Sequence, residues 1–124
     1  MTTPKDLKDR TKRFAVSSIQ LCRELPTTLD GRRVGQQLID ASTSVAANYR
    51  ATCRARSRAE FIAKMGTVLE ESDESLFWLE LIVDAKLAPY QRVEKLLIEA
   101  DELTAIFTAS LKTAKGNGGG RNQN

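Results

Sequence analysis

The sequence predicts an all-α fold, an antiparallel up-down-up-down four-helix bundle. Apolar residues recur every three or four positions in four segments, and no segment alternates apolar and polar residues as a strand would. Prolines and turn residues separate these segments by short links. A chain of 124 residues is long enough to bury one modest core and too short for two domains.

The first helix should begin at residues 3–4, because threonine caps helix N-termini and the missing N–H of proline is harmless in the first turn. It should end at residues 25–26, since the residue before a proline disfavours the helical conformation. Residues 27–31 then form the link. Within it, Asp30 is expected to cap a second helix that covers about residues 32–55.

The third helix opens with a capping box at residues 57–60, in which a serine accepts a hydrogen bond from the third helical N–H while a glutamate reaches back. It runs to about residue 86, and a fourth helix covers about residues 89–114. We expect residues 1–114 to form the bundle. The tail, residues 115–124, holds four of the seven glycines and is expected to be disordered.

Charge is divided unevenly along the chain. Residues 1–58 carry 12 Lys+Arg and 5 Asp+Glu, a net charge of +7, whereas residues 59–124 carry 7 and 11, a net charge of −4. This division predicts either a polarised surface or pairing between like subunits, unless the two halves of one bundle neutralise each other.

Composition makes several classes of protein improbable. There is no histidine, the commonest general base and metal ligand, and no serine or cysteine has a base partner of that kind, so we expect neither an enzyme nor a cofactor. Cys22 and Cys53 are expected to be free thiols in a cytoplasmic protein. No apolar run approaches the ~20 residues that span a bilayer, so no membrane contact is expected.

Four acidic residues lie between positions 70 and 74. Helical bundles can hold two metal ions through such carboxylates, but they also use histidines and inward-facing glutamates of other helices, which this pattern does not provide. A solvated or interfacial acidic patch is therefore the preferred interpretation.

A basic run lies where the second helix meets the third. Residues 50–58 hold four arginines and no acid. A helix dipole favours cations at its C-terminus by about 0.3 to 1 kcal/mol each, which explains the first three arginines. It does not explain Arg58, which is expected at the start of the next helix, where the dipole disfavours a cation. Phosphate is the expected counter-ion, although such a run can also be an ordinary solvated surface. The nucleic-acid candidates are Arg32, Arg50, Arg54, Arg56 and Arg58, the first being on the same side of its helix as Arg50.

The third helix carries more large apolar residues than its core-facing side can bury. With successive residues about 100° apart, three of them fall well off the core stripe. Large exposed apolar residues mark partner surfaces, so we expect self-association; the alternative is a helix buried on two sides within its own bundle. The oligomer-interface candidates are Val16, Ile19, Glu70, Glu74, Phe77, Trp78 and Leu81.

Several sequence blocks together resemble a known bacterial family. They are Ser-Val-Ala-Ala-Asn-Tyr-Arg-Ala at 44–51, Ala-Arg-Ser-Arg-Ala-Glu-Phe at 55–61, Glu-Glu-Ser-Asp-Glu at 70–74 and Trp-Leu-Glu-Leu at 78–81. This pattern is similar to the "four helix bundle protein" family, which includes proteins encoded within intervening sequences of 23S ribosomal RNA genes. The resemblance covers about residues 5–112.

The resemblance implies a homopentamer of four-helix bundles. It also implies kinship with the accessory variability protein of diversity-generating retroelements, a basic pentamer that binds nucleic acid and partners a reverse transcriptase. Most members of the family have no established activity. The residues of these blocks that we interpret as structural are Asn48, Tyr49, Ser57, Glu60, Phe61 and Glu71.

Two functional hypotheses follow. The first is a non-catalytic, ring-like homo-oligomer that binds structured RNA or DNA through the arginine corner without reading sequence. The second is a protein-interaction scaffold with no nucleic-acid binding, in which the arginines pair with Glu70, Glu71 and Glu74 of a neighbouring subunit.

Overall fold

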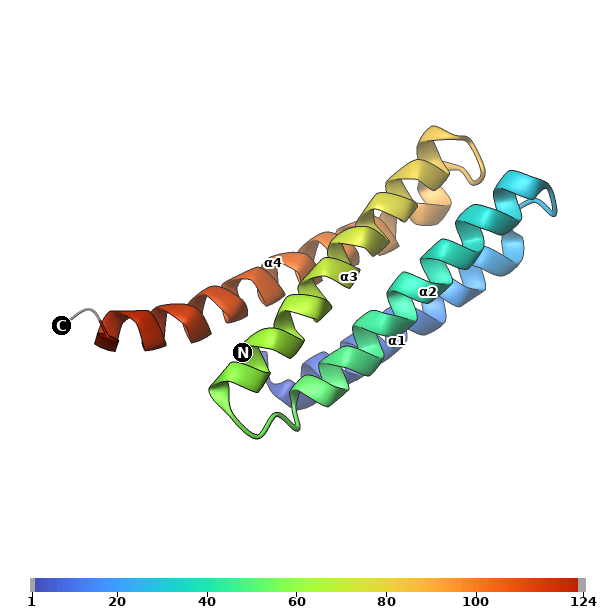
Figure 1. Ribbon diagram of the computed structural model, residues 1–124. Helices are drawn as coiled ribbons and strands as arrows, with labels where there is room; N and C mark the ends of the chain where they lie inside the picture. The colour runs from blue at the N-terminus through green and yellow to red at the C-terminus, as the bar shows by residue number, and fades with distance from the viewer. Residues whose placement is uncertain (1, 123–124) are drawn as a thin grey trace.

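The computed structural model describes the backbone of residues 2–122 and the side chains of residues 2–116. It contains four helices, α1 (Pro4–Glu24), α2 (Leu29–Thr52), α3 (Arg58–Asp84) and α4 (Tyr90–Asn122). Successive helices run in opposite directions and pack on one another in chain order, so the fold is the predicted all-α up-down bundle (Figure 1). The C-terminal half of α4 diverges from the other helices, and α1 and α4 therefore pack less extensively than the other neighbours (Figure 1).

The predicted ends of α1 are confirmed. The Thr3 hydroxyl accepts a hydrogen bond from the Asp6 N–H, and the Asp6 carboxylate accepts one from the Thr3 N–H, each at 3.1 Å. These bonds favour the ionised carboxylate and lower the pKa of Asp6. At the other end, Leu25 adopts an extended conformation before Pro26 and ends the helix.

The prediction for α2 was wrong at both ends by three residues. Thr28, not Asp30, is the N-cap, because its hydroxyl accepts a hydrogen bond from the Gly31 N–H at 3.3 Å. The Asp30 carboxylate instead accepts hydrogen bonds from the Thr28 hydroxyl and the Gly31 N–H. At the C-terminus, the amides of Arg54 and Ala55 bond to carbonyls three residues earlier, which tightens the chain into a turn after Thr52.

Ser57 caps α3 as predicted, and its hydroxyl accepts a hydrogen bond from the Glu60 N–H at 3.0 Å. The Glu60 carboxylate, however, reaches the N–H of Arg56 at 3.0 Å rather than that of the serine. The helix ends at Asp84, two residues earlier than expected. Lys86 there takes a left-handed conformation with φ of 59°, which closes the helix end.

The end of α4 differs most from the expectation. The sequence placed it near residue 114 and assigned disorder to residues 115–124, whereas the helix continues to Asn122. Glycine weakens a helix by about 1 kcal/mol per residue but leaves its backbone hydrogen bonds possible, and no proline follows Pro89. Residues 123 and 124 lie outside the part of the chain that the structure describes.

All four helices contribute to a continuous apolar core. Leu21 of α1, Leu38 of α2, Leu79 of α3 and Phe107 of α4 are each completely buried. The Tyr49 ring lies 5.7 Å from the Phe107 ring, centroid to centroid, and links α2 to α4 across the core. Two hydroxyls, those of Ser72 and Thr104, share a hydrogen bond of 2.7 Å between α3 and α4.

Two ion-pair clusters join α1 to α4. Arg10 bonds to the carboxylates of Glu99 and Glu102, and Arg92 bonds to both oxygens of Glu24 at 2.7 and 2.6 Å. The hydrogen bonds from Arg92 lower the pKa of Glu24. Of the helix pairs that pack on each other, α1 and α4 share the least packing, and these ion pairs join them.

Gly31 permits the tight link between α1 and α2. A Cβ at this position would lie 2.1 Å from the carbonyl oxygen of Pro26, so Gly31→Ala must displace backbone and should destabilise the fold by about 2 kcal/mol or more. A Cβ at Gly66 would meet nothing within 4 Å, so Gly66→Ala should stabilise α3 by up to about 1 kcal/mol. Urea unfolding of both variants tests this contrast, and an equal effect in the two would contradict it.

Candidate nucleic-acid interface

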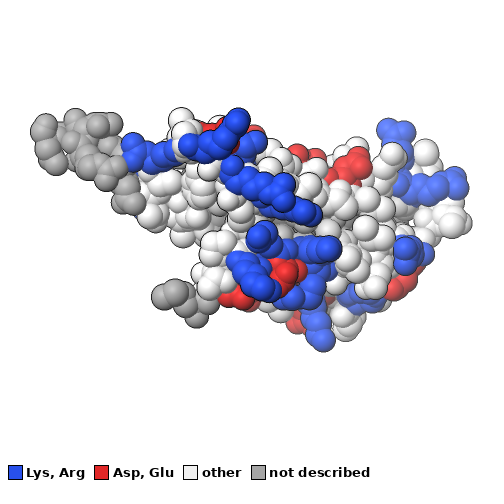
Figure 2. Space-filling view, turned by 90° about the horizontal axis from the view of Figure 1, so that it is seen from below, with Lys and Arg blue, Asp and Glu red and all other residues white. Residues whose placement is uncertain are grey.

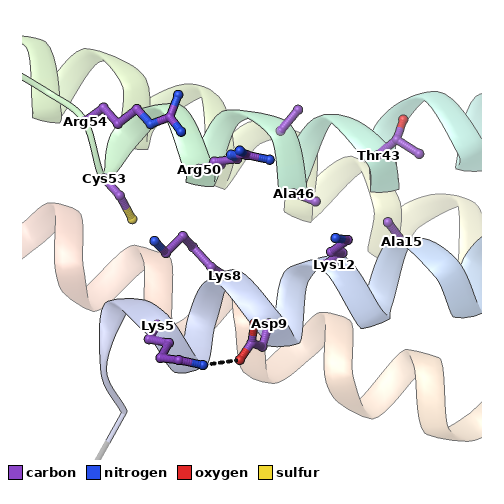
Figure 3. Close-up of a pocket in the computed structure, with 11 residues that line it drawn as sticks. Lys5, Lys8, Asp9, Lys12, Ala15, Thr43, Ala46, Arg50, Cys53 and Arg54 are labelled. Atoms are coloured by element: carbon purple, nitrogen blue, oxygen red, sulfur yellow. Dashed lines mark hydrogen bonds and ion pairs between the residues drawn. The ribbon is translucent and has the colours of Figure 1, made fainter.

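A groove of about 610 Å³ lies between α1 and the C-terminal half of α2 (Figure 3). Five of the eleven residues that line it are cationic and one is acidic. We call it the basic groove; its lining residues are Lys5, Lys8, Asp9, Lys12, Ala15, Thr43, Ala46, Ala47, Arg50, Cys53 and Arg54.

One wall of the basic groove is a row of three lysines on α1. Lys5, Lys8 and Lys12 follow one another at intervals of three and four residues, which places them on one face of the helix. Asp9 forms an exposed ion pair with Lys5, with 3.3 Å between Nζ and Oδ2. Neither Lys8 nor Lys12 has a carboxylate within ion-pairing distance in the described part of the chain.

The opposite wall comes from the end of α2. Arg50 lies in the last turn of the helix and Arg54 follows four residues later, both exposed and both without an ion-pair partner among the described residues. The side chains of Lys8 and Arg50 extend from opposite helices into the space between them (Figure 3). Small residues such as Ala46 leave this space open.

Four cations that have no acidic partner in the described structure thus surround one concave surface. Like charges one helical turn apart cost a few tenths of a kcal/mol, and here two such rows face each other. A bound polyanion would offset that repulsion. Guanidinium and ammonium groups bind phosphate oxygens through charge-assisted hydrogen bonds, so the basic groove can hold several phosphates at once.

The structure does not gather the five predicted arginines into one site. Arg50 and Arg54 line the basic groove, whereas Arg58 lines a second cavity at the end of the bundle. Arg56 lies 3.7 Å from a Glu60 oxygen in an exposed ion pair. Arg32 is eighteen residues before Arg50 on α2, about 27 Å away along the helix axis.

Sequence reasoning missed the three lysines of α1. Their helical spacing and the +7 charge of residues 1–58 could have indicated them. Residues 50–58 were favoured instead because their four arginines lie close together in sequence. The up-down topology places the start of α1 beside the end of α2 and so joins the two rows. On the face shown in Figure 2, Lys and Arg side chains are more abundant than Asp and Glu.

A second surface feature is an aromatic pair on α3. Phe77 is 52% exposed, and its ring meets that of Trp78 edge to face with centroids 4.9 Å apart. Trp78 is half-buried against the core, and its indole N–H donates a 3.4 Å hydrogen bond to the Glu74 carboxylate. Leu81 is half-buried and Glu70 exposed. These five residues form what we call the aromatic patch.

The two interface candidates on α1 lie elsewhere. Val16 is 47% exposed and Ile19 is half-buried. In the described part of the bundle, α1 packs on α2 and α4 but not on α3. The structure therefore does not combine Val16 and Ile19 with the aromatic patch into one surface of a single subunit.

Beside the aromatic patch, the Glu71 carboxylate is partly buried. Burial raises its pKa, and the neighbouring charges of Glu74, Glu70 and Asp40 raise it further. A raised folded-state pKa means that stability falls as the pH rises from the unfolded pKa through the folded one. No arginine forms an ion pair with Glu71 in the described structure.

We therefore expect Glu71→Gln to raise the melting temperature at pH 7 by about 1–3 °C, because it removes the buried charge. Near pH 3, where the carboxyl is protonated in both states, the gain should vanish. Thermal melts monitored by circular dichroism at the two pH values check this. A loss of stability at pH 7 would show that the ionised carboxylate is favourably solvated.

The remaining residues singled out in the sequence have local contacts. The Asn48 side-chain amide donates to the Ser44 carbonyl at 2.9 Å, Tyr49 is buried, and Phe61 packs half-buried against the core. Both cysteines are free, as expected. Burial raises the pKa of the Cys22 thiol to about 11, whereas Cys53 is exposed at the end of the basic groove.

Two kinds of feature are absent from the described residues. No group of three or more acidic or cysteine side chains among them is placed to hold a metal ion. None of the described helices has the length and apolar character required to span a bilayer.

Comparison with known proteins identifies the family. A protein of unknown function from the S23 ribosomal protein family of Bacteroides thetaiotaomicron has a similar crystal structure, with 28% sequence identity and a TM-score of 0.76 over 86% of this chain and 98% of the other. Comparison with curated proteins gives no significant match. Residues 5–109 match the family described as 23S rRNA-intervening sequence protein, and the chain therefore belongs to that family.

Proposed function

We propose that this protein is a non-catalytic, cytoplasmic homo-oligomer that binds RNA or DNA. It contacts the phosphates through the basic groove and does not read the base sequence. The resemblance to its family suggests that the oligomer is a pentamer. The observation that carries the proposal is the convergence of Lys8, Lys12, Arg50 and Arg54 on one groove without acidic partners in the described structure. The family name refers to intervening sequences of 23S rRNA genes and makes RNA the first ligand to test.

Salt dependence tests this proposal. Four phosphate contacts predict a slope of about −2.8 for log affinity against log salt with a single strand, so affinity should fall about 50-fold between about 50 and 200 mM salt. Fluorescence anisotropy with a labelled RNA of arbitrary sequence measures the slope. Absence of binding at about 50 mM salt would contradict the proposal, and so would strong preference for one sequence.

A second candidate, a protein-interaction scaffold, is favoured by the aromatic patch. Phe77 exposes half its surface beside Trp78, and exposed aromatic pairs are typical of interface centres. The same patch is the surface through which we propose that copies associate. In the scaffold alternative, arginines would bind a neighbour's carboxylates, so their reversal would disrupt the oligomer rather than RNA binding.

Trp78→Ala should weaken association by at least about tenfold in dissociation constant, because it removes the larger ring of the aromatic patch. Light scattering over a dilution series measures the assembly, and circular dichroism measures the fold. Val34→Ala, which trims a half-buried residue elsewhere on the bundle, serves as the control. A Trp78→Ala variant that stays assembled yet melts far earlier would place this residue in the core instead.

A further inference from the structure

Two kinds of side chain that commonly recognise bases, aromatic rings and amides, are absent from the described lining of the basic groove. Its described lining contains no aromatic ring on which a base could stack and no asparagine or glutamine for a base edge. The only neutral hydroxyl in that lining is that of Thr43, and it already donates to the Ile39 carbonyl at 2.7 Å. Apart from the exposed thiol of Cys53, the remaining neutral residues are alanines. Apart from the Asp9 carboxylate, which pairs with Lys5, the charged groups of the groove are cations that can bind phosphate oxygens.

The two walls also limit the width of the ligand. Neighbouring helices pack with axes about 8–10 Å apart. A duplex is wider than this separation, because its major groove alone is about 12 Å wide. A duplex would touch only the rims of the basic groove. A thin chain can enter it and contact Lys8 and Lys12 on one side and Arg50 and Arg54 on the other.

We propose that the basic groove binds a single extended phosphate chain as such, and that inorganic polyphosphate, which has no bases or sugars, is a ligand. The inference rests on the proposed function because both use the same cations. It adds that the phosphate chain alone is recognised. A single-stranded nucleic acid binds with its bases turned out to solvent, and polyphosphate, which has no bases, binds through the same cations.

Titration calorimetry with polyphosphate of several tens of phosphates tests the inference. We expect binding at low salt, competition with a single-stranded RNA, and no comparable competition from orthophosphate at the same phosphorus concentration. A single-stranded oligonucleotide should bind more tightly than a duplex of equal length. Lys8→Gln and Arg50→Gln should each weaken polyphosphate binding by about tenfold.

Arg33→Gln is the matched control, because Arg33 is exposed on the same helix as Arg50 but does not line the basic groove. Its binding should equal that of the unmodified protein, and circular dichroism should show all variants folded. An equal loss in the Arg33 variant, or tighter binding of the duplex, would overturn the inference.

The two proposals can fail separately. If RNA binds through the basic groove and polyphosphate does not, the inference is wrong and the proposed function stands. If polyphosphate binds through the groove and neither RNA nor DNA does, the proposed function is wrong and the phosphate-chain site stands. If RNA, DNA and polyphosphate all fail to bind, both are wrong.

Discussion

Reversing one charge on each wall of the basic groove, Lys8→Glu with Arg50→Glu, should lower RNA affinity on the order of 100-fold at low salt. Each substitution removes a charge-assisted hydrogen bond worth about 1.5–3 kcal/mol. Because only two of the four phosphate-binding cations remain, the salt slope for a single strand should fall from about −2.8 to about −1.4. Fluorescence anisotropy across a salt series measures both quantities.

The matched control for this double variant reverses two cations outside the basic groove, Arg33→Glu with Lys112→Glu. Both residues are exposed, and neither has an ion-pair partner among the described residues. The control has the same net charge as the groove variant. If its affinity for RNA falls as far, binding depends on overall charge and the basic groove has no special role.

Phe107→Ala should destabilise the fold by about 3–5 kcal/mol, because it removes a completely buried ring and leaves a cavity beside Tyr49. This is a large part of the roughly 5–15 kcal/mol by which a domain is normally stable. Denaturation in guanidinium chloride, monitored by circular dichroism at one fixed protein concentration, measures the loss.

Phe77→Ala provides the comparison, since Phe77 is the same residue type with half its surface exposed. Its truncation should cost less than about 1.5 kcal/mol of folding free energy. Because Phe77 belongs to the aromatic patch, the comparison is made at a protein concentration low enough for the unmodified protein to be monomeric. Equal losses at the two positions would mean that the core does not lie where the helix packing places it.

The fold was largely predictable because its signals are local. Apolar spacing and the proline before α2 identify helices without knowledge of their neighbours, and Thr3 and Ser57 cap as expected. Thr28 was missed because threonine and aspartate are both good caps, and residues two apart can exchange that role. The length of α4 was not predicted because its glycines lower the helix propensity of the segment. A lowered propensity still allows a helix to form.

The candidate site was only partly predictable because it joins residues that are distant in sequence. Arg50 and Arg54 were found as part of a basic run, but Lys8 and Lys12 acquire meaning only when α1 lies beside the end of α2. The same run also contains Arg58, but this residue follows the turn after α2 and lines another cavity. Proximity in sequence therefore identified one wall of the groove and not the other.

Lysine acetylation in the presence and absence of RNA, read by mass spectrometry, tests the location of binding most directly. We expect RNA to protect Lys8 and Lys12 strongly, and Lys5 more weakly because of its ion pair with Asp9. Lys64 on α3 and Lys112 on α4 should react equally in both samples. Binding between α1 and α2 would be contradicted if saturating RNA left the acetylation of Lys8 and Lys12 unchanged. It would also be contradicted if RNA protected only Lys64 and Lys112.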